Sequence, residues 1–125
     1  MASGTIPTQS KNLGTPDDAE VAIPFLWQGK QLYYRAMKIN SITAGSYSYV
    51  QFRASDTNNA GQILACGGYY SASASTIRTL PYGDIAMYGT WAYSSSNWRC
   101  RCVVDNQSTG DISNVVLWAI YTHGD

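Results

Sequence analysis

The sequence predicts an all-β domain, with an antiparallel sandwich or a small jelly-roll-like fold. Charged residues make up only 13% of the 125 residues, whereas the strand and turn formers Ser, Thr, Gly, Asn and Tyr are plentiful. Strand-like runs, about seven to nine of them, recur along the chain with turn signals between them. No stretch keeps a helical period over several turns. A chain of this length can bury one core, which predicts a single domain.

The order of the strands follows from these runs. The first spans 21–27, where Pro24 indicates an edge position or a bulge. In the run 47–53, Val50 and Phe52 share one side of the strand and are expected to face the core. The last run is apolar on both faces, which predicts a central strand or one shared with a neighbouring subunit. The remaining strands are predicted over 30–39, 62–68, 75–81, 84–91, 98–104 and 113–122.

The first 20 residues differ in composition from the rest. Residues 1–20 mix Pro, Gly, Ser and charge without periodicity, which predicts a flexible arm or linker ahead of a single β domain over 21–125. The opening Met-Ala-Ser resembles an expression remnant at 1–3. Such an arm is typical of a terminal module joined to a longer chain.

The three cysteines, Cys66, Cys100 and Cys102, are expected to be reduced, because no signal segment indicates an oxidising compartment. On an extended strand Cys100 and Cys102 share a face with Trp98 and Val104, and we expect that face to lie in the core. With one histidine and no Cys-x-x-Cys pair, the sequence predicts no metal site and no cofactor.

Charge and hydropathy argue against two classes of partner. Eight basic and eight acidic residues leave no net charge, so the electrostatic footprint of a nucleic-acid binder is missing. The longest apolar run, 115–121, is far shorter than the ~20 residues that a membrane span requires. We therefore expect neither nucleic-acid binding nor membrane insertion.

The sequence predicts no catalytic residues. The carboxylates beyond residue 20 lie in or beside predicted turns, where Asp serves as a turn former rather than as half of a catalytic pair. His123 stands near the end of a tail that we expect to fray, so a Ser-His-Asp arrangement would lack a positioned base. We predict that the protein is not an enzyme. The carboxylates in question are Asp56, Asp84, Asp105, Asp111 and Asp125.

The stretch "LWQGKQLYYRAMKI" carries a family resemblance. Its Trp, Gly-Lys turn and Tyr-x-Arg strand resemble the "W-x-D-G-K-P-I-Y-R-K" opening of a small β domain at the C-terminal ends of bacteriophage tail-fibre and baseplate proteins. "TLPYGD" resembles the Leu-Pro turn of that family, and "TGDISNVVLWAIYT" resembles its G-D-x-S turn and closing strand. The likeness spans Trp27 to Thr122, with Gln28 in place of the usual Asp and Gln31 in place of the Pro.

This resemblance implies a place in the virion, in a tail fibre or baseplate assembled in the host cytoplasm. It also implies a homotrimer on a fibre axis and a role in recognising the host surface. It supplies no catalytic residues.

Two predicted loops, 67–76 and 89–97, combine aromatic and small polar residues. Rigid Tyr and Trp rings provide contact area, including for sugar faces, while Ser, Gly and Asn adapt their hydrogen bonds, which is the composition of recognition surfaces. Trp98 is assigned to the core, and Trp91 is either a cap on the core or a ligand contact. The candidate ligand-binding residues are Tyr69, Tyr70, Trp91, Tyr93, Asn97, Arg99 and Arg101.

Arg99 and Arg101 share the face opposite the cysteines. They are either solvated, or in contact with an anionic group of a cell-surface glycan, or bridged to a neighbouring protomer. Tyr33, Tyr47 and Tyr49 are expected on faces opposite the core, where exposed rings promote association. We assign these three tyrosines to an oligomer interface.

Together these features predict non-enzymatic host-surface recognition at the tip of a phage tail fibre or baseplate protein, with a saccharide or surface protein bound by Tyr/Ser/Asn-rich loops. Many identical tips would turn weak single contacts into firm attachment. Two alternatives stay open. One is a structural trimerisation, capping or decoration domain of a virion fibre, whose aromatic residues would be buried. The other is a soluble microbial lectin or variable binding protein outside any virion.

Overall fold

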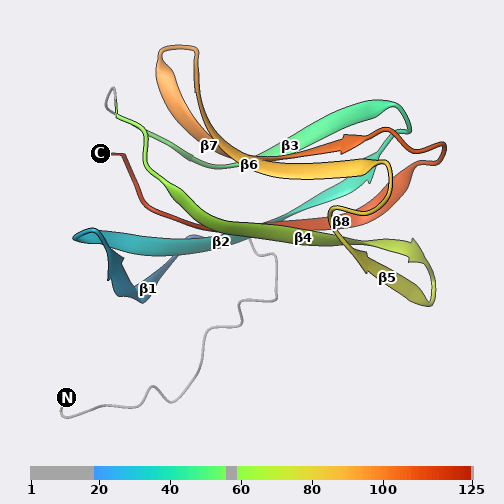
Figure 1. Ribbon diagram of the computed structural model, residues 1–125, viewed down its shortest axis with the longest axis horizontal. Coiled ribbons are helices and arrows are strands. Elements are labelled where there is room, and N and C mark those ends of the chain that lie inside the picture. The colour runs from blue at the N-terminus through green and yellow to red at the C-terminus, as the bar shows by residue number, and fades with distance from the viewer. Residues whose placement is uncertain (1–18, 56–58, 125) are drawn as a thin grey trace, which may run out of the picture.

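The computed structural model describes residues 19–55 and 59–124, and the regular structure of this part is entirely β-strand. Eight strands follow one another along the chain (Figure 1). None of the described residues belongs to a helix that is long and apolar enough to cross a membrane. The strands are β1 (Val21–Trp27), β2 (Lys30–Ile42), β3 (Ser46–Ala54), β4 (Ile63–Ser73), β5 (Thr76–Thr79), β6 (Ile85–Ser94), β7 (Asn97–Asn106) and β8 (Ile112–Tyr121).

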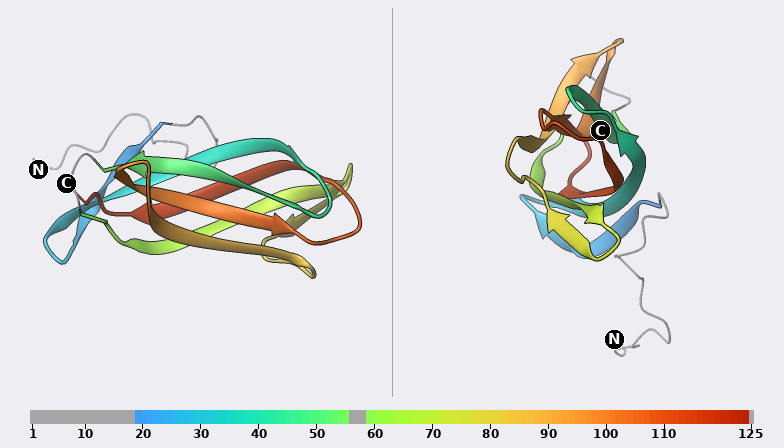
Figure 2. Two further views of the ribbon diagram at one scale, coloured as in Figure 1. Left: turned by 90° about the horizontal axis from the view of Figure 1, so that it is seen from above. Right: turned by 90° about the vertical axis from the view of Figure 1, so that its right-hand side faces the viewer.

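The strands form two antiparallel sheets that pack face to face. The larger sheet has the order β1-β2-β8-β4-β5, and the smaller has the order β3-β7-β6. Figure 2 shows the two layers from above and from one end, with the chain crossing between them several times. The predicted all-β, sandwich-like class is confirmed. The predicted arm lies mostly outside the described residues, which begin at Ala19.

The core lies between the sheets and depends on β8 and β7, the strands at their centres. Cys100 and Cys102 of β7 are fully buried, and Val50 and Phe52 of β3 point inward beside them, as predicted. β8 lies between β2 and β4, which confirms its prediction as a central strand. Its inward residues are Val115, Leu117, Ala119 and Tyr121.

β1 is an edge strand with an irregular middle. Its pairing with β2 shifts register between Ile23 and Leu26. Pro24 falls inside this stretch, where its missing N–H removes no ladder hydrogen bond. The edge position and the bulge indicated by Pro24 are therefore both observed. The turn into β2 places Gln28 and Gly29 in the left-handed region, with φ of 50° and 79°.

β4 extends further than predicted, because its second half forms a hairpin with β5. Tyr69 and Tyr70 therefore lie in a strand and not in a loop, and they point to opposite faces of the sheet. Tyr69 is half-buried on the outer side. Tyr70 is only 3% exposed and belongs to the core, so its assignment to a ligand-binding surface is wrong.

The predicted interface tyrosines divide between the two sides of the sandwich. The register of β2 against β8 places Tyr33 opposite Tyr121, on the inward side, where it packs against the core. The sequence predicted that Tyr33 faces away from the core, and this prediction is wrong. Tyr47 and Tyr49 do lie on the outer side of β3, with 69% and 44% of their surface exposed.

The side of the larger sheet that faces away from the core is also apolar, whereas an outer sheet face is commonly polar. Trp118 stacks on Tyr34 there, with 6.2 Å between ring centroids. Gly67 makes room for the indole, since a Cβ at this position would lie 2.7 Å from Trp118. We call this surface the outer apolar face. It is centred on Leu32, Tyr34, Ala36, Tyr69, Val116, Trp118 and Ile120.

The three cysteines are free thiols, and two of them are inaccessible. Burial, with smaller contributions from the neighbouring Cys102 and Cys66, raises the pKa of the Cys100 thiol to about 12. Burial likewise raises the pKa of Cys102 to about 12, with a contribution from Cys66. Both thiols are thus protonated, packed core groups at neutral pH.

We expect Cys100 and Cys102 to resist iodoacetamide in the folded protein up to pH 9. The thiolate is the reactive form, and with a pKa of about 12 only about one molecule in a thousand carries it at that pH. Mass spectrometry of peptides would locate the modified thiols, with protein in 6 M guanidinium as the control in which all three react. Rapid modification of both residues in the native protein at pH 8 would contradict the buried placement.

Candidate functional site

A cleft lies at the end of the sandwich where the β1–β2 and β6–β7 hairpins project (Figure 1). The β6–β7 hairpin curves away from the larger sheet at this end. The volume of the cleft is about 630 Å³. We call it the tip cleft. Its lining residues are Trp27, Gly61, Gln62, Ile63, Leu64, Gly89, Thr90 and Trp91.

The two tryptophans reach the tip cleft from different sheets. Trp27 ends β1 and is 42% exposed, and its Nε1 donates a hydrogen bond to Oε1 of Gln62 at 2.6 Å. Trp91 lies on β6 opposite Cys100, so its side chain is on the inward side and packs against the core. Gly61 packs closely against Trp91 and the backbone of Thr122, because a Cβ there would lie 2.9 Å from Cζ2 of Trp91 and 2.1 Å from the carbonyl oxygen of Thr122.

The residues that line the tip cleft offer aromatic and amide groups. None of its lining residues carries a titratable side chain, so they supply no general acid or base. They supply two indole rings and the side-chain amide of Gln62. Nε1 of Trp91 is buried and has no hydrogen-bond partner among the described residues.

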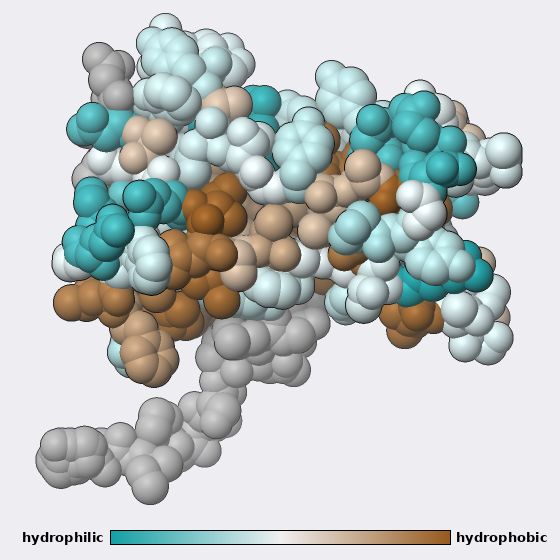
Figure 3. Space-filling model, viewed as in Figure 1, coloured by the Kyte–Doolittle hydropathy of each residue, from teal (hydrophilic) through white to brown (hydrophobic). Residues whose placement is uncertain are grey.

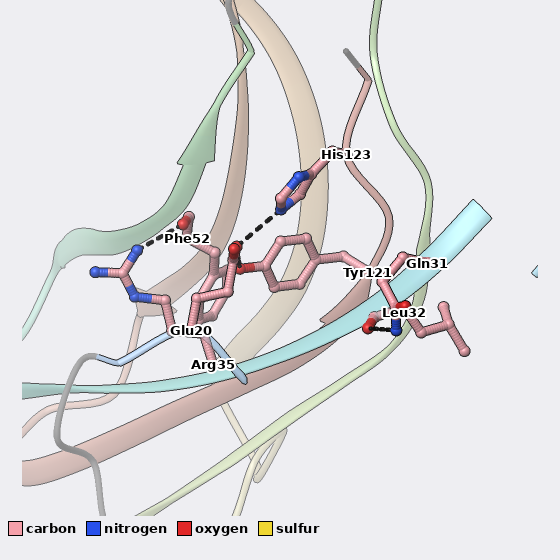
Figure 4. Close-up of polar contacts among 7 residues, drawn as sticks. All are labelled: Glu20, Gln31, Leu32, Arg35, Phe52, Tyr121 and His123. Atoms are coloured by element: carbon pink, nitrogen blue, oxygen red, sulfur yellow. Dashed lines mark hydrogen bonds and ion pairs between the residues drawn. The ribbon is translucent and has the colours of Figure 1, made fainter. Parts of the chain in front are cut away.

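A second polar cluster joins the beginning of the domain to its end (Figure 4). The Tyr121 hydroxyl donates to Oε2 of Glu20, and Nε2 of His123 lies 3.0 Å from the same oxygen. The ring of His123 stacks flat on Tyr33, with centroids 3.8 Å apart. We call these residues the Glu20 cluster. His123 is therefore held in place, and the prediction of a frayed tail around it is wrong.

The Tyr121 hydroxyl stays protonated in the Glu20 cluster. Burial raises the pKa of the Tyr121 hydroxyl, and the hydrogen bond to Glu20 and the charge of Glu20 raise it further, while Arg35 opposes them. Tyr121 therefore remains a neutral donor. Arg35 itself donates to the backbone oxygen of Phe52 at 2.7 Å, which links the two sheets.

The outer side of the smaller sheet carries tyrosines and arginines. The guanidinium carbon of Arg101 lies 4.4 Å from the ring centroid of Tyr49. Arg99 donates from Nε to the backbone oxygen of Ser94 and from Nη1 to Oε1 of Gln51. We call this surface the Tyr–Arg face. It consists of Tyr47, Tyr49, Tyr88, Arg99 and Arg101.

The structure separates the predicted ligand-binding residues. Trp91 lines the tip cleft, Tyr69 lies in the outer apolar face, and the two arginines belong to the Tyr–Arg face. Tyr93 and Asn97 lie near the end of the β6–β7 hairpin. Trp98 is half-buried there, with its ring edge against Tyr93 and 5.6 Å between centroids. It is not among the residues of the core cluster, contrary to the prediction, because its hairpin extends beyond the core.

Sequence reasoning missed Trp27 and Gln62 as cleft residues. Trp27 entered the sequence analysis only as part of a family motif, and Gln62 was placed at the start of a strand. The signal that could have found Trp27 is the run Phe25-Leu26-Trp27 on a strand that Pro24 marks as an edge. Phe25 and Leu26 are 68% and 66% exposed. Figure 3 shows hydrophobic residues gathered over β1 and the adjoining end of the larger sheet.

No family model matches the chain, and no curated protein or solved structure shows a significant match. Within residues 19–55 and 59–124, no three His, Cys, Asp or Glu side chains are grouped so that they could hold a metal ion. The tip cleft and the Tyr–Arg face are therefore assessed from their own geometry and chemistry.

We expect Glu20→Ala to lower the free energy of unfolding by about 1–3 kcal/mol, because it leaves the Tyr121 hydroxyl without its acceptor. Asp84→Ala is the matched control, an exposed carboxylate that should change stability by less than about 0.5 kcal/mol. Urea unfolding followed by tryptophan fluorescence would measure both. In a Tyr121→Phe background the effect of Glu20→Ala should shrink, and equal effects in both backgrounds would refute the hydrogen bond as its cause.

Proposed function

We propose that this protein is a non-enzymatic recognition domain that binds a saccharide in the tip cleft. The observation that carries the proposal is the presence of Trp27 and Trp91 in one cleft of about 630 Å³, in which none of the described lining residues has a titratable side chain. This volume falls within the range of small-molecule binding sites, roughly 300–1,000 Å³. The absence of acid and base groups from the lining favours binding over hydrolysis.

A saccharide suits the groups in the cleft better than a purely apolar ligand does. A pyranose has an apolar ring face, which an indole covers, and a rim of hydroxyls that donate and accept hydrogen bonds. The side-chain amide of Gln62 offers both a donor and an acceptor. An apolar ligand would leave the amide N–H groups of Gln62 without a partner, at a cost in free energy.

We further propose that the saccharide lies on a host cell surface and that the domain belongs to a bacteriophage tail fibre or baseplate protein. The order of motifs between Trp27 and Thr122 supports this setting. Several copies of the domain, as in a homotrimer, would combine weak single-site binding into firm attachment. A soluble microbial lectin would use the same cleft, so that alternative differs in location and not in binding chemistry.

An alternative function is a structural, self-associating module, and the outer apolar face favours it. Val116 and Ala36 are buried on this face, while Trp118 and Ile120 are half-exposed. Among the residues of β2, β8 and β4 that pair with one another, Lys38 is the one charged side chain on this face. An apolar surface of this kind is typical of an interface between subunits.

The binding proposal predicts that fluorescently labelled protein attaches to some bacterial strains and not to others. The double variant Trp27→Ala/Gln62→Ala should bind at least about tenfold more weakly, because it removes a stacking surface and a hydrogen-bonding amide. Phe25→Ala is the matched control, since Phe25 is exposed on the same strand but does not line the cleft. Flow cytometry on cells and calorimetry with purified surface polysaccharides would measure the affinities.

Light scattering on every sample would show whether the variants keep the parent's oligomeric state. If the parent protein attaches to no strain and to no polysaccharide, or if the double variant binds as well as Phe25→Ala, the tip cleft is not the binding site.

The structural alternative predicts self-association that a charge on the outer apolar face abolishes. Ile120→Lys should convert the oligomer to a monomer, because an unpaired ammonium would be buried in the interface. Ala86→Lys places the same charge on an exposed position of the smaller sheet and should leave the oligomer intact. Static light scattering gives the masses. A parent protein that is monomeric at high concentration would rule out this interface.

A further inference from the structure

The Tyr–Arg face is arranged in rows across three strands. Val103 of the middle strand β7 pairs with Tyr88 on one side and with Tyr49 on the other. In the next row Arg101 pairs with Thr90 and Gln51. Residues that pair in a β-ladder point to the same side of the sheet. Tyr49, Tyr88 and Arg101 therefore surround Val103 on this side. Tyr49 and Tyr88 are 44% and 53% exposed.

Arg101 is a cation without a counter-ion in the part of the chain that the structure describes. Its guanidinium lies over the ring of Tyr49 at 4.4 Å, which fixes the orientation of the planar group. Its Nε is buried and has no hydrogen-bond partner. The carboxylate on the same face, Asp105, is four residues away along β7, roughly 13 Å, and accepts a hydrogen bond from Gln107. The other arginine of the face, Arg99, is hydrogen-bonded only to neutral groups.

Arg78 is a second arginine that stacks on a tyrosine, and the charges around it differ from those around Arg101. Arg78 lies over the ring of Tyr82 at the same 4.4 Å. Asp84 and Asp111 line the groove that this pair borders, so its positive charge has carboxylates nearby. Arg101 has none in its row or in the two rows beside it. Arg78 thus shares a groove with two carboxylates, whereas Arg101 has none in the three rows around it.

We propose that the Tyr–Arg face binds an acidic saccharide, with a carboxylate of the sugar on Arg101 and pyranose rings on Tyr49 and Tyr88. A stacked guanidinium offers its free N–H groups to a planar carboxylate in a pairwise geometry. Charge complementarity selects the anion, and the exposed rings select a partner with flat apolar faces. This site is separate from the tip cleft and does not depend on the function proposed for it.

The spacing of the tyrosines fits a chain of sugars. Tyr49 and Tyr88 lie on the two strands that flank β7, so their backbones are about 9–10 Å apart, which two linked pyranose rings can span. Arg101 lies on the middle strand one row further along, within reach of a substituent on either ring. A free phosphate would contact the arginine but leave both rings unused.

The test is a titration of ¹⁵N-labelled protein with oligosaccharides of galacturonate, of glucuronate and of N-acetylneuraminate, each beside its methyl ester. The Nε–Hε signal of Arg101 reports on the Tyr–Arg face, and the indole signal of Trp27 reports independently on the tip cleft. We expect at least one acid to shift the Arg101 signal and its ester, which has the same rings but no charge, to leave the signal unchanged. Raising the salt concentration should weaken the interaction.

Variants of Arg101 and Arg78 distinguish binding at the Tyr–Arg face from nonspecific electrostatic attraction. Arg101→Gln should lower the affinity about tenfold, and Arg101→Lys should lower it less, because the charge remains but the planar group is lost. Arg78→Gln is the matched control and should stay within about twofold of the parent. The proposal is overturned if no acid shifts the Arg101 signal, if esters and acids act equally, if inorganic phosphate binds as tightly as the saccharide, or if Arg78→Gln loses as much affinity as Arg101→Gln.

Discussion

The rest of this structure depends on burying β8. The strand is apolar on both sides, with Leu117 and Ala119 turned toward the core and Val116 and Trp118 turned away from it. Such a strand must have a neighbour on each edge, and β2 and β4 fill these places. Its inward side requires a second layer, which the smaller sheet supplies. Its outward side requires cover as well, and the large rings of the outer apolar face provide part of it.

The tip cleft lies between parts of both sheets. The β6–β7 hairpin curves away from the larger sheet at one end of the sandwich (Figure 1), and Trp91 of this hairpin lines the cleft together with Trp27. Trp91 therefore has a double role, packing against the core on one side and bordering the cleft on the other. At the same end of the sandwich, the Glu20 cluster joins Glu20, which precedes β1, to Tyr121 and His123 at the end of β8 and just after it.

Aromatic residues serve the core and two outer faces of this domain. Tyr121 and Tyr70 are core residues, Tyr49 and Tyr88 are exposed beside an uncompensated arginine, and Tyr69 lies in an apolar face that suits self-association. Recognition of a saccharide in the cleft, of an acidic saccharide on the Tyr–Arg face and of further copies on the outer apolar face would engage separate sides of the sandwich. The proposed functions are therefore compatible with one another.

The sequence by itself determined the β class, the positions of most strands, the central place of β8 and the burial of Cys100 and Cys102, because these follow from local alternation and apolar runs. The tertiary structure decided which residues meet. Tyr70 and Tyr33 entered the core because strand length and pairing register set their faces, and neither can be determined from local composition. Trp27, Gln62 and Trp91 come together only because three segments distant in sequence end at the same edge of the sandwich.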